Sequence, residues 1–115
     1  MRRDDLIRIR HMLDSAKETM SFAKNKTRKD LDNDRMLTLS VLKSIEIIGE
    51  AASKVTNETR SNCLDIPWDN IVAMRNRLIH VYFDIDHDRV WDTITDDLPP
   101  LINALENLVS SEKLS

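Results

Sequence analysis

The chain is poor in the residues that interrupt helices and in those that favour strands. It contains one glycine, three prolines and 4% aromatic residues in a length of 115. Glycine and proline mark turns, whereas aromatic residues are enriched in strands. Their scarcity favours helix over sheet, and the length suits a single domain. We therefore expect residues 1–115 to form one all-α domain.

Cysteine and long apolar runs are also scarce. Cys63 is the one cysteine, so an internal disulfide is excluded and a reducing compartment is expected. No apolar run is long enough for a secretory signal or a membrane span. The net charge of −3 is unlike that of proteins that coat nucleic acid with a broad basic face, so any contact with nucleic acid must be local. We expect a cytoplasmic protein with no membrane association.

Apolar residues recur every three or four positions, as in amphipathic helices. The first helix should follow Asp4 or Asp5, either of which can cap it. The second should begin near Asp32–Asp34 and end near Val55, with Gly49 allowing a close helix approach. The first two apolar stripes are Leu6, Ile9, Leu13, Ala16, Met20 and Ala23, then Val41, Ile45, Ile48, Ala52 and Val55.

Two further helices are expected in the second half of the chain. The third should start at Pro67 and Trp68 and carry an apolar stripe as far as Val81. The fourth should be capped by Asp86 and be kinked or restarted at the two prolines 99–100. Loops are expected at 24–30, 56–65 and 84–88, and residues 111–115 should fray. The sequence thus predicts an antiparallel bundle of four to five helices with no strand.

Two charged groups leave alternatives open. The cations of 24–30 suit a solvated connection or a contact with RNA at the edge of a groove. Glu46 and Glu50 lie four residues apart, on one helix face. They suit a solvated face or a pair that orients an arginine across an interface.

The candidate site lies in residues 74–83, which contain Arg75, Asn76, His80 and Tyr82. Arginine can hold a phosphate with a planar fork of donors, and histidine moves protons near neutral pH. If this stretch is helical, Asn76 and His80 share a face and Arg75 lies to one side. A single helix cannot place all of these side chains together in one site. Two copies of the chain related by a two-fold axis would bring the motif of one copy close to that of the other. Packing and carbonyl capping are the alternative roles for Arg75 and His80.

Other kinds of site fail on spacing. Residues 84–88 start like a calcium loop, but Arg89 and Thr95 occupy the positions of its required glycine and glutamate. The histidines and Cys63 lack zinc-site spacing, and no glycine-rich phosphate loop or serine-nucleophile turn is present. We therefore expect no metal and no cofactor.

The stretch from Arg75 to His80 and Tyr82 resembles the signature of the HEPN superfamily, specifically the HepT-like toxins of HepT/MntA toxin–antitoxin pairs. Residues 45–52, 66–68, 82–85, 90–91 and 97–99 also match that pattern. The resemblance covers roughly residues 1–110. It implies an all-α HEPN-like fold, a two-fold homodimer and a metal-independent endoribonuclease whose paired Arg–His motifs line a shared cleft.

Carried over by position, the resemblance implies that Arg75 and His80 are catalytic, with Asn76 as a supporting polar residue. It also implies that a cognate MntA-like nucleotidyltransferase antitoxin transfers AMP to Tyr82; a buried tyrosine is the alternative role. The substrate would be transfer RNA or messenger RNA. The competing functional hypothesis is a non-catalytic HEPN module that binds RNA, nucleotide or the nucleotidyltransferase. A purely structural helical dimer would explain the apolar stripes but not the polar cluster.

Overall fold

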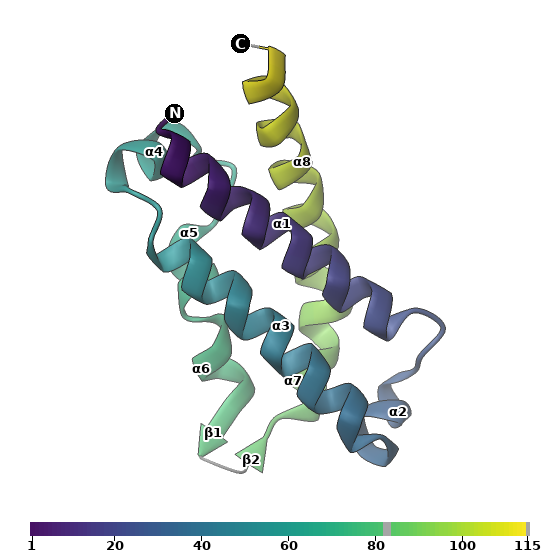
Figure 1. Ribbon diagram of the computed structural model, residues 1–115. Helices are drawn as coiled ribbons and strands as arrows, with labels where there is room; N and C mark the ends of the chain where they lie inside the picture. Colours follow the sequence, from purple (N-terminus) through teal and green to yellow (C-terminus); the bar gives the residue numbers. More distant parts are fainter. Residues whose placement is uncertain (82–83, 115) are drawn as a thin grey trace.

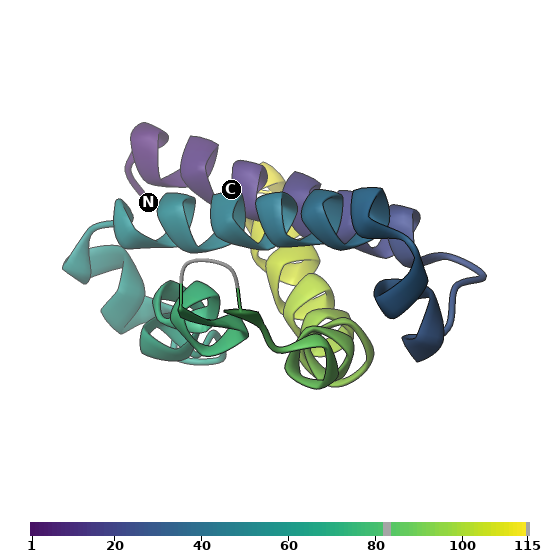
Figure 2. The ribbon, with the colours of Figure 1, turned by 90° about the horizontal axis from the view of Figure 1, so that it is seen from below.

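The computed structural model describes residues 1–81 and 84–114, without the side chains of residues 80, 81, 113 and 114 (Figure 1). Two long helices, α1 (Arg3–Ala23) and α3 (Arg35–Ser53), lie side by side and antiparallel, and form one layer. The second layer contains the remaining helices of the bundle (Figure 2). These are α5 (Trp68–Val72), α6 (Met74–Leu78), α7 (His87–Asp92) and α8 (Leu98–Leu114). The described residues are mostly helical, as the sequence predicted.

The core lies between the layers. The helices α1 and α3 bury most of the residues in their predicted apolar stripes. In α1 the predicted residues Leu6, Met20 and Ala23 are only half-buried, and Met12, which was not predicted, is fully buried. Burying one such apolar side chain contributes roughly 1.5–3 kcal/mol. The fully buried residues from these two helices include Ile9, Met12, Ala16, Val41, Ile45, Ile48 and Ala52.

Gly49 lies where α3 meets α5. A Cβ atom added to Gly49 would lie 3.2 Å from the carbonyl oxygen of Ile71 and 3.6 Å from that of Val72. The first distance is tighter than ordinary van der Waals contact, so the backbone of α5 approaches α3 more closely than a larger residue would allow. The expected close helix approach at Gly49 is confirmed.

Two segments that were expected to be loops contain short helices. These are α2 (Arg28–Asn33) and α4 (Asn57–Asn62). Each begins at a threonine cap: Asp30 accepts hydrogen bonds from the Thr27 backbone at 2.7 Å and hydroxyl at 3.2 Å, and the Thr56 hydroxyl accepts from Thr59 N at 3.4 Å. Side-chain capping satisfies amides that a short helix otherwise leaves unpaired. The prediction of loops through 24–30 and 56–65 was therefore wrong in part.

Neither Asp4 nor Asp5 caps α1, contrary to the expectation, because both lie within the first turn of the helix. The residue before α1 is Arg2, and no side chain caps the helix there. Asp5 is instead fully buried and accepts hydrogen bonds from Thr56 N at 3.0 Å, the Thr56 hydroxyl at 2.6 Å and the Thr59 hydroxyl at 2.6 Å. These bonds join the start of α1 to α4.

The third helical segment departs most from the prediction. It is divided at Ala73 into α5 and α6, and it ends at Leu78 instead of continuing to Val81. An antiparallel hairpin follows, of β1 (Ile79–Val81) and β2 (Asp84–Ile85), with Ile79 opposite Ile85. Asp86 N donates to Leu78 O at 2.8 Å beside this pair. The β-branched residues at 79, 81 and 85 suit extended backbone, which explains why a helical spacing here did not produce a helix.

The last part of the chain is one helical rod with an irregularity. The predicted cap is confirmed, because the Asp86 carboxylate accepts from Arg89 N at 3.0 Å at the start of α7. A π turn, η1 (Thr93–Asp97), joins α7 to α8. The break therefore precedes the two prolines, which cannot donate to the carbonyls four residues earlier, and those carbonyls lie in η1. The backbone of the expected frayed tail is helical as far as Leu114, and Ser115 lies outside the described residues.

No helix in the described part of the chain is long and apolar enough to cross a membrane.

Candidate functional site

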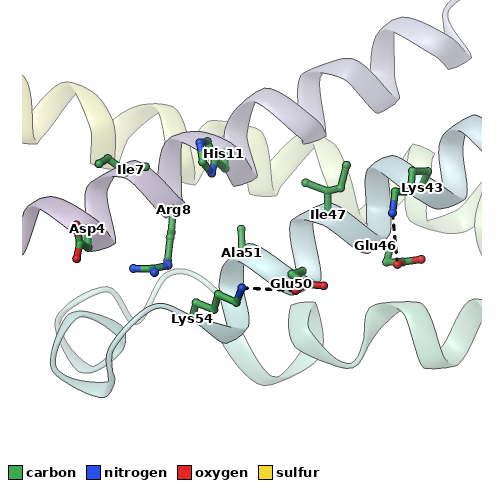
Figure 3. Close-up of a pocket in the computed structure, with 10 residues that line it drawn as sticks. All are labelled: Asp4, Ile7, Arg8, His11, Lys43, Glu46, Ile47, Glu50, Ala51 and Lys54. Carbon is green, nitrogen blue, oxygen red and sulfur yellow. Dashed lines mark ion pairs between the residues drawn. The ribbon is translucent and has the colours of Figure 1, made fainter.

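Arg75 is the predicted site residue that the structure defines best. It lies on α6, and its side chain is 51% exposed. Its Nε atom donates to Oε2 of Glu46 on α3 at 3.3 Å. The other oxygen of Glu46 lies 3.7 Å from Nζ of Lys43, one turn earlier on α3 (Figure 3). Arg75 is thus an exposed cation that is held from one side by an acid of a neighbouring helix.

The structure describes the other predicted site residues to different extents. Asn76 is exposed on α6, and its side chain has no hydrogen-bond partner within the described residues. The backbone of His80 lies in β1, while its side chain lies outside the described part. Tyr82 also lies outside the described residues. The expectation that Asn76 and His80 share a helix face was wrong, because α6 ends at Leu78 and the chain continues as a strand.

The two glutamates of α3 have different partners. Glu46 contacts Arg75, whereas Oε1 of Glu50 lies 3.6 Å from Nζ of Lys54 in the last turn of the same helix. The carboxylate of Glu46 does orient an arginine, but within one chain, where the sequence suggested a contact across an interface. Glu50 belongs to a solvent-exposed face.

A groove between α1 and α3 adjoins this contact (Figure 3). We call it the α1–α3 groove; its volume is about 550 Å³. Three cations and three acids line it together with His11, so with a neutral imidazole it carries no net charge. These are Arg8, Lys43 and Lys54, and Asp4, Glu46 and Glu50. A groove of balanced charge is not by itself a path for a polyanion, in line with the chain's acidic balance.

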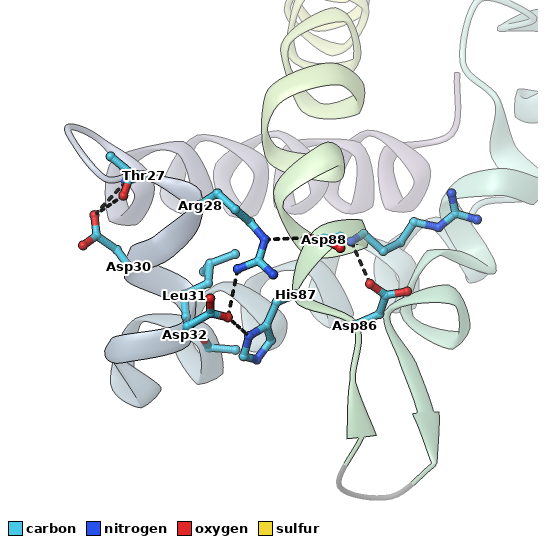
Figure 4. A network of polar contacts seen from close by, with 10 residues as sticks. Thr27, Arg28, Asp30, Leu31, Asp32, Asp86, His87 and Asp88 are labelled. Carbon is cyan, nitrogen blue, oxygen red and sulfur yellow. Dashed lines mark hydrogen bonds and ion pairs between the residues drawn. The ribbon is translucent and has the colours of Figure 1, made fainter.

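A second polar cluster lies beyond the hairpin (Figure 4). Arg28 on α2 donates from Nη1 to Asp32 at 2.9 Å and from Nε to Asp88 on α7 at 2.7 Å. Nδ1 of His87 lies 2.7 Å from the same oxygen of Asp32. The hydrogen bonds from His87 and Arg28 hold the pKa of Asp32 below its usual value. We call these four residues the α2–α7 network.

The α2–α7 network fixes the start of α7 immediately after the hairpin that contains His80. Arg28, one of the cations of 24–30, pairs with two carboxylates, a structural role that neither of the two alternatives for this segment included. The sequence contained one signal for the network, the four-residue spacing of Arg28 and Asp32. Its contact with Asp88, sixty residues away, depends on tertiary structure and has no local signal.

The fold and the site together define a class: a small helical protein with an exposed, acid-anchored arginine beside a histidine-containing hairpin. Comparison with known proteins specifies the family. Residues 12–108 match the family described as Ribonuclease HepT-like, and the chain belongs to this family.

Several named relatives support this assignment. A Methanocaldococcus jannaschii protein named Putative RNase MJ1380 is 34% identical over 95 residues, which cover 83% of this chain and 87% of the relative. Putative RNase TTE0752 of Caldanaerobacter subterraneus subsp. tengcongensis is 31% identical over 105 residues, covering 91% and 94%. Probable ribonuclease HepT of Thermococcus cleftensis is 36% identical over 75 residues, covering 65% and 68%. No solved structure matched the chain.

Proposed function

We propose that this protein is a metal-independent endoribonuclease and the toxin of a toxin–antitoxin pair. Its substrate would be transfer RNA or messenger RNA, and its site would combine Arg75 and His80 at the cleft of a two-fold dimer. The observation that carries the proposal is the exposed guanidinium of Arg75, held on Nε by Glu46, on a helix that ends just before the strand of His80. Membership of the Ribonuclease HepT-like family supports it.

The proposed reaction uses the ribose of the substrate as the nucleophile. The imidazole of His80 removes the proton from a 2′-hydroxyl, and the resulting oxygen attacks the adjacent phosphorus. The bond to the 5′-oxygen of the next nucleotide breaks, and a second imidazole or a water molecule protonates that oxygen. The products are a 2′,3′-cyclic phosphate and a 5′-hydroxyl. DNA lacks the nucleophile and should resist cleavage.

Arg75 would stabilise the negative charge that develops on the phosphate oxygens. A guanidinium offers a planar fork of donors, which matches two oxygens of one phosphate. In the structure Nε is occupied by Glu46, while no described residue bonds to the two terminal nitrogens. A guanidinium arranged in this way can accept a phosphate without first losing a protein partner. Asn76, exposed on the same helix, would contribute a further polar contact.

Control of the toxin would act on the hairpin. We propose that a MntA-like nucleotidyltransferase antitoxin transfers AMP to Tyr82, two residues after His80 in the sequence. The added phosphate would compete with RNA for Arg75, and the adenosine would obstruct the cleft.

The deciding experiment incubates the purified protein with total RNA and with transfer RNA in the presence of a chelator. We expect cleavage that leaves 2′,3′-cyclic phosphate ends, with a matched DNA strand left intact. Loss of activity in chelator, with recovery on adding a metal ion, would contradict the metal-independent mechanism. RNA binding without cleavage by the folded protein would instead favour a non-catalytic HEPN module.

A further inference from the structure

We propose that Glu46 is a positioning residue for Arg75. Its carboxylate occupies Nε of the guanidinium and so directs the two terminal nitrogens toward the phosphate of the substrate. This inference rests on the proposed ribonuclease function and adds to it a residue outside the segment that contains Arg75 and His80. The evidence is the contact of 3.3 Å between Nε and Oε2, which joins two helices through residues that are 29 positions apart in the chain.

The way in which Arg75 is held differs from that of its neighbour Arg77. Arg77 lies two residues further along α6, and its terminal nitrogen Nη2 donates to both the backbone oxygen and the side-chain oxygen of Asn70, each at 3.0 Å. Arg77 therefore uses the end of its guanidinium for a structural contact. Arg75 is bonded through Nε only, which leaves its terminal nitrogens without a partner among the described residues. Of these two arginines, Arg75 is the one that is both fixed and open to a ligand.

The energy of the contact points to orientation as its main role. The side chain of Glu46 is 39% exposed and that of Arg75 is 51% exposed, so water screens their attraction. Ion pairs of this kind contribute about 0.2–1 kcal/mol to stability. Losing the contact should therefore do little to the fold. A misplaced guanidinium, in contrast, loses alignment with the charge that develops during the reaction, and this alignment is worth more.

The surrounding structure keeps the carboxylate in place. Lys43 lies 3.7 Å from Oε1 of Glu46, whereas Arg75 contacts Oε2. Gly49, one turn after Glu46, allows the backbone of α5 to approach α3, and α6 with Arg75 follows α5 after Ala73. The distance between Glu46 and Arg75 thus depends on a helix contact that only a glycine accommodates without displacement.

The test compares Glu46→Ala, Glu46→Gln and Glu50→Ala. Glu50 is the matched control, because it lies one turn later on α3 and pairs with Lys54, not with Arg75. For RNA cleavage we expect Glu46→Ala to lower kcat about tenfold with little change in KM. Glu46→Gln should retain most of the activity, since its amide oxygen can still accept from Nε. Glu50→Ala keeps the contact between Glu46 and Arg75, so it should cleave RNA faster than Glu46→Ala when light scattering shows the same dimer content for both variants.

A spectroscopic measurement tests the same inference without relying on catalysis. The Nε–H signal of Arg75 in an NMR spectrum, assigned by its loss in Arg75→Lys, should exchange slowly with water in the wild type and in Glu50→Ala. It should exchange rapidly in Glu46→Ala. Thermal unfolding should show that the variants remain folded, as expected for a partly exposed ion pair.

The outcomes separate the inference from the proposed function. If the wild type cleaves RNA, Arg75→Ala does not, and Glu46→Ala cleaves as fast as Glu50→Ala, the positioning role is overturned while the ribonuclease remains. Equal exchange of the Arg75 signal in Glu46→Ala and the wild type also overturns it. If the wild type cleaves no RNA but the signal is protected by Glu46, the proposed function fails and the anchoring of Arg75 stands.

Discussion

Two arginines of one short helix show how a single side chain can be assigned a role. Arg75 and Arg77 have the same chemistry and both lie on α6, yet one is bonded through Nε and the other through Nη2. We expect Arg75→Ala to lose at least about a hundredfold in RNA cleavage, the scale of one removed donor to a developing charge. Arg75→Lys should also be impaired, because an ammonium lacks the planar fork. Arg77→Ala, as a control, should retain far more activity; equal losses would argue against a special role for Arg75.

His80 is the proposed general base. His80→Ala should abolish RNA cleavage and leave the helical circular dichroism spectrum unchanged, because the variant removes a proton acceptor and no helix. Cleavage assays with transfer RNA provide the measurement. A fully active and folded His80→Ala protein would rule out the proposed mechanism.

Tyr82 is the proposed site of modification. Incubation with a cognate MntA-like nucleotidyltransferase and with ATP should add the mass of one or more AMP units to Tyr82 and suppress cleavage. Mass spectrometry of the digested protein locates the addition. Inhibition that is undiminished in Tyr82→Phe, or AMP found at another residue, would show that Tyr82 is not the switch.

The residues of the site were easier to predict than their arrangement. The side-chain chemistry of Arg75, Asn76 and His80 is visible in the sequence, but the helix that was expected to carry all three ends at Leu78. The contact between Arg75 and Glu46 was not predicted, because one alternative for Glu46 and Glu50 was only that they orient an unspecified arginine across an interface. Local spacing cannot reveal it, because it depends on how α3 and α6 pack.

At the scale of elements, long amphipathic helices were predicted well and short elements were not. The helices α1 and α3 are specified by apolar stripes over several turns, so many residues contribute to each prediction. The helix α4 has six residues, mostly polar, and a buried aspartate of α1 bonds to the threonine that caps it. Tertiary contacts of this kind override weak local preferences, and a short polar segment shows no sign of them.

Asp5 links α1 to α4, and it should make this attachment sensitive to acid. Burial raises its pKa, but the hydrogen bonds from Thr56 and Thr59 outweigh burial and hold the pKa below its usual value. A lowered carboxyl pKa stabilises the fold above the ordinary pKa of about 4 and loses this effect as the pH falls below it. We expect Asp5→Asn to reduce the free energy of unfolding at pH 7 by roughly 2 kcal/mol.

Urea unfolding of Asp5→Asn at pH 7 and at pH 3 measures this effect. The deficit relative to the wild type should shrink as the pH falls from 7 to 3, because the unfolded chain, whose carboxyl has the ordinary pKa of about 4, then binds a proton that the folded state binds less readily. The exposed neighbour Asp4 supplies the control, because Asp4→Asn removes the same charge and no hydrogen bond in the described structure. An equal effect of the two substitutions at pH 7 would contradict the role of the buried network.

The α2–α7 network should steady the hairpin. Asp32 accepts from both Arg28 and His87, so Asp32→Asn weakens two contacts at once. We expect a lower thermal midpoint and faster hydrogen exchange of the Asp86 amide, which bonds to Leu78 O at the base of the hairpin. Asp92→Asn removes an exposed acid of α7 from outside the network and should leave this exchange unchanged. Unchanged exchange in Asp32→Asn would separate the network from the hairpin.

At the scale of the whole molecule, the proposed site needs a second copy. Exposed apolar side chains accompany the balanced charges of the α1–α3 groove, with Ile7 42% and Ile47 37% exposed. A two-fold dimer that uses α3 and α6, the helices of Glu50 and Arg75, could cover such a surface with its own copy. Light scattering should show a dimer, and an active monomer at low concentration would contradict the proposal.

Mixing two inactive variants tests whether the dimer shares one site. Arg75→Ala and His80→Ala should each be inactive alone, whereas their mixture, after subunit exchange, should recover part of the cleavage activity. Each mixed dimer would then have one Arg75 and one His80 facing a common cleft. A mixture of confirmed mixed dimers that remains inactive would show that each chain needs its own complete pair.

The π turn η1 has a consequence for how this chain could change length. Its hydrogen bonds join residues five positions apart, instead of four as in an α-helix. Residues 93–97 therefore contain one more amino acid than a regular α-helical turn would. Buried Ile94 and Leu98 nevertheless keep the same side toward the core. Deleting Thr95, which is exposed, should remove the extra residue and leave Ile94 and Leu98 facing the core. The same deletion in the middle of α3 would rotate half of its apolar stripe into water. Within the described helices we therefore expect η1 to tolerate the loss of one residue without turning an apolar stripe away from the core.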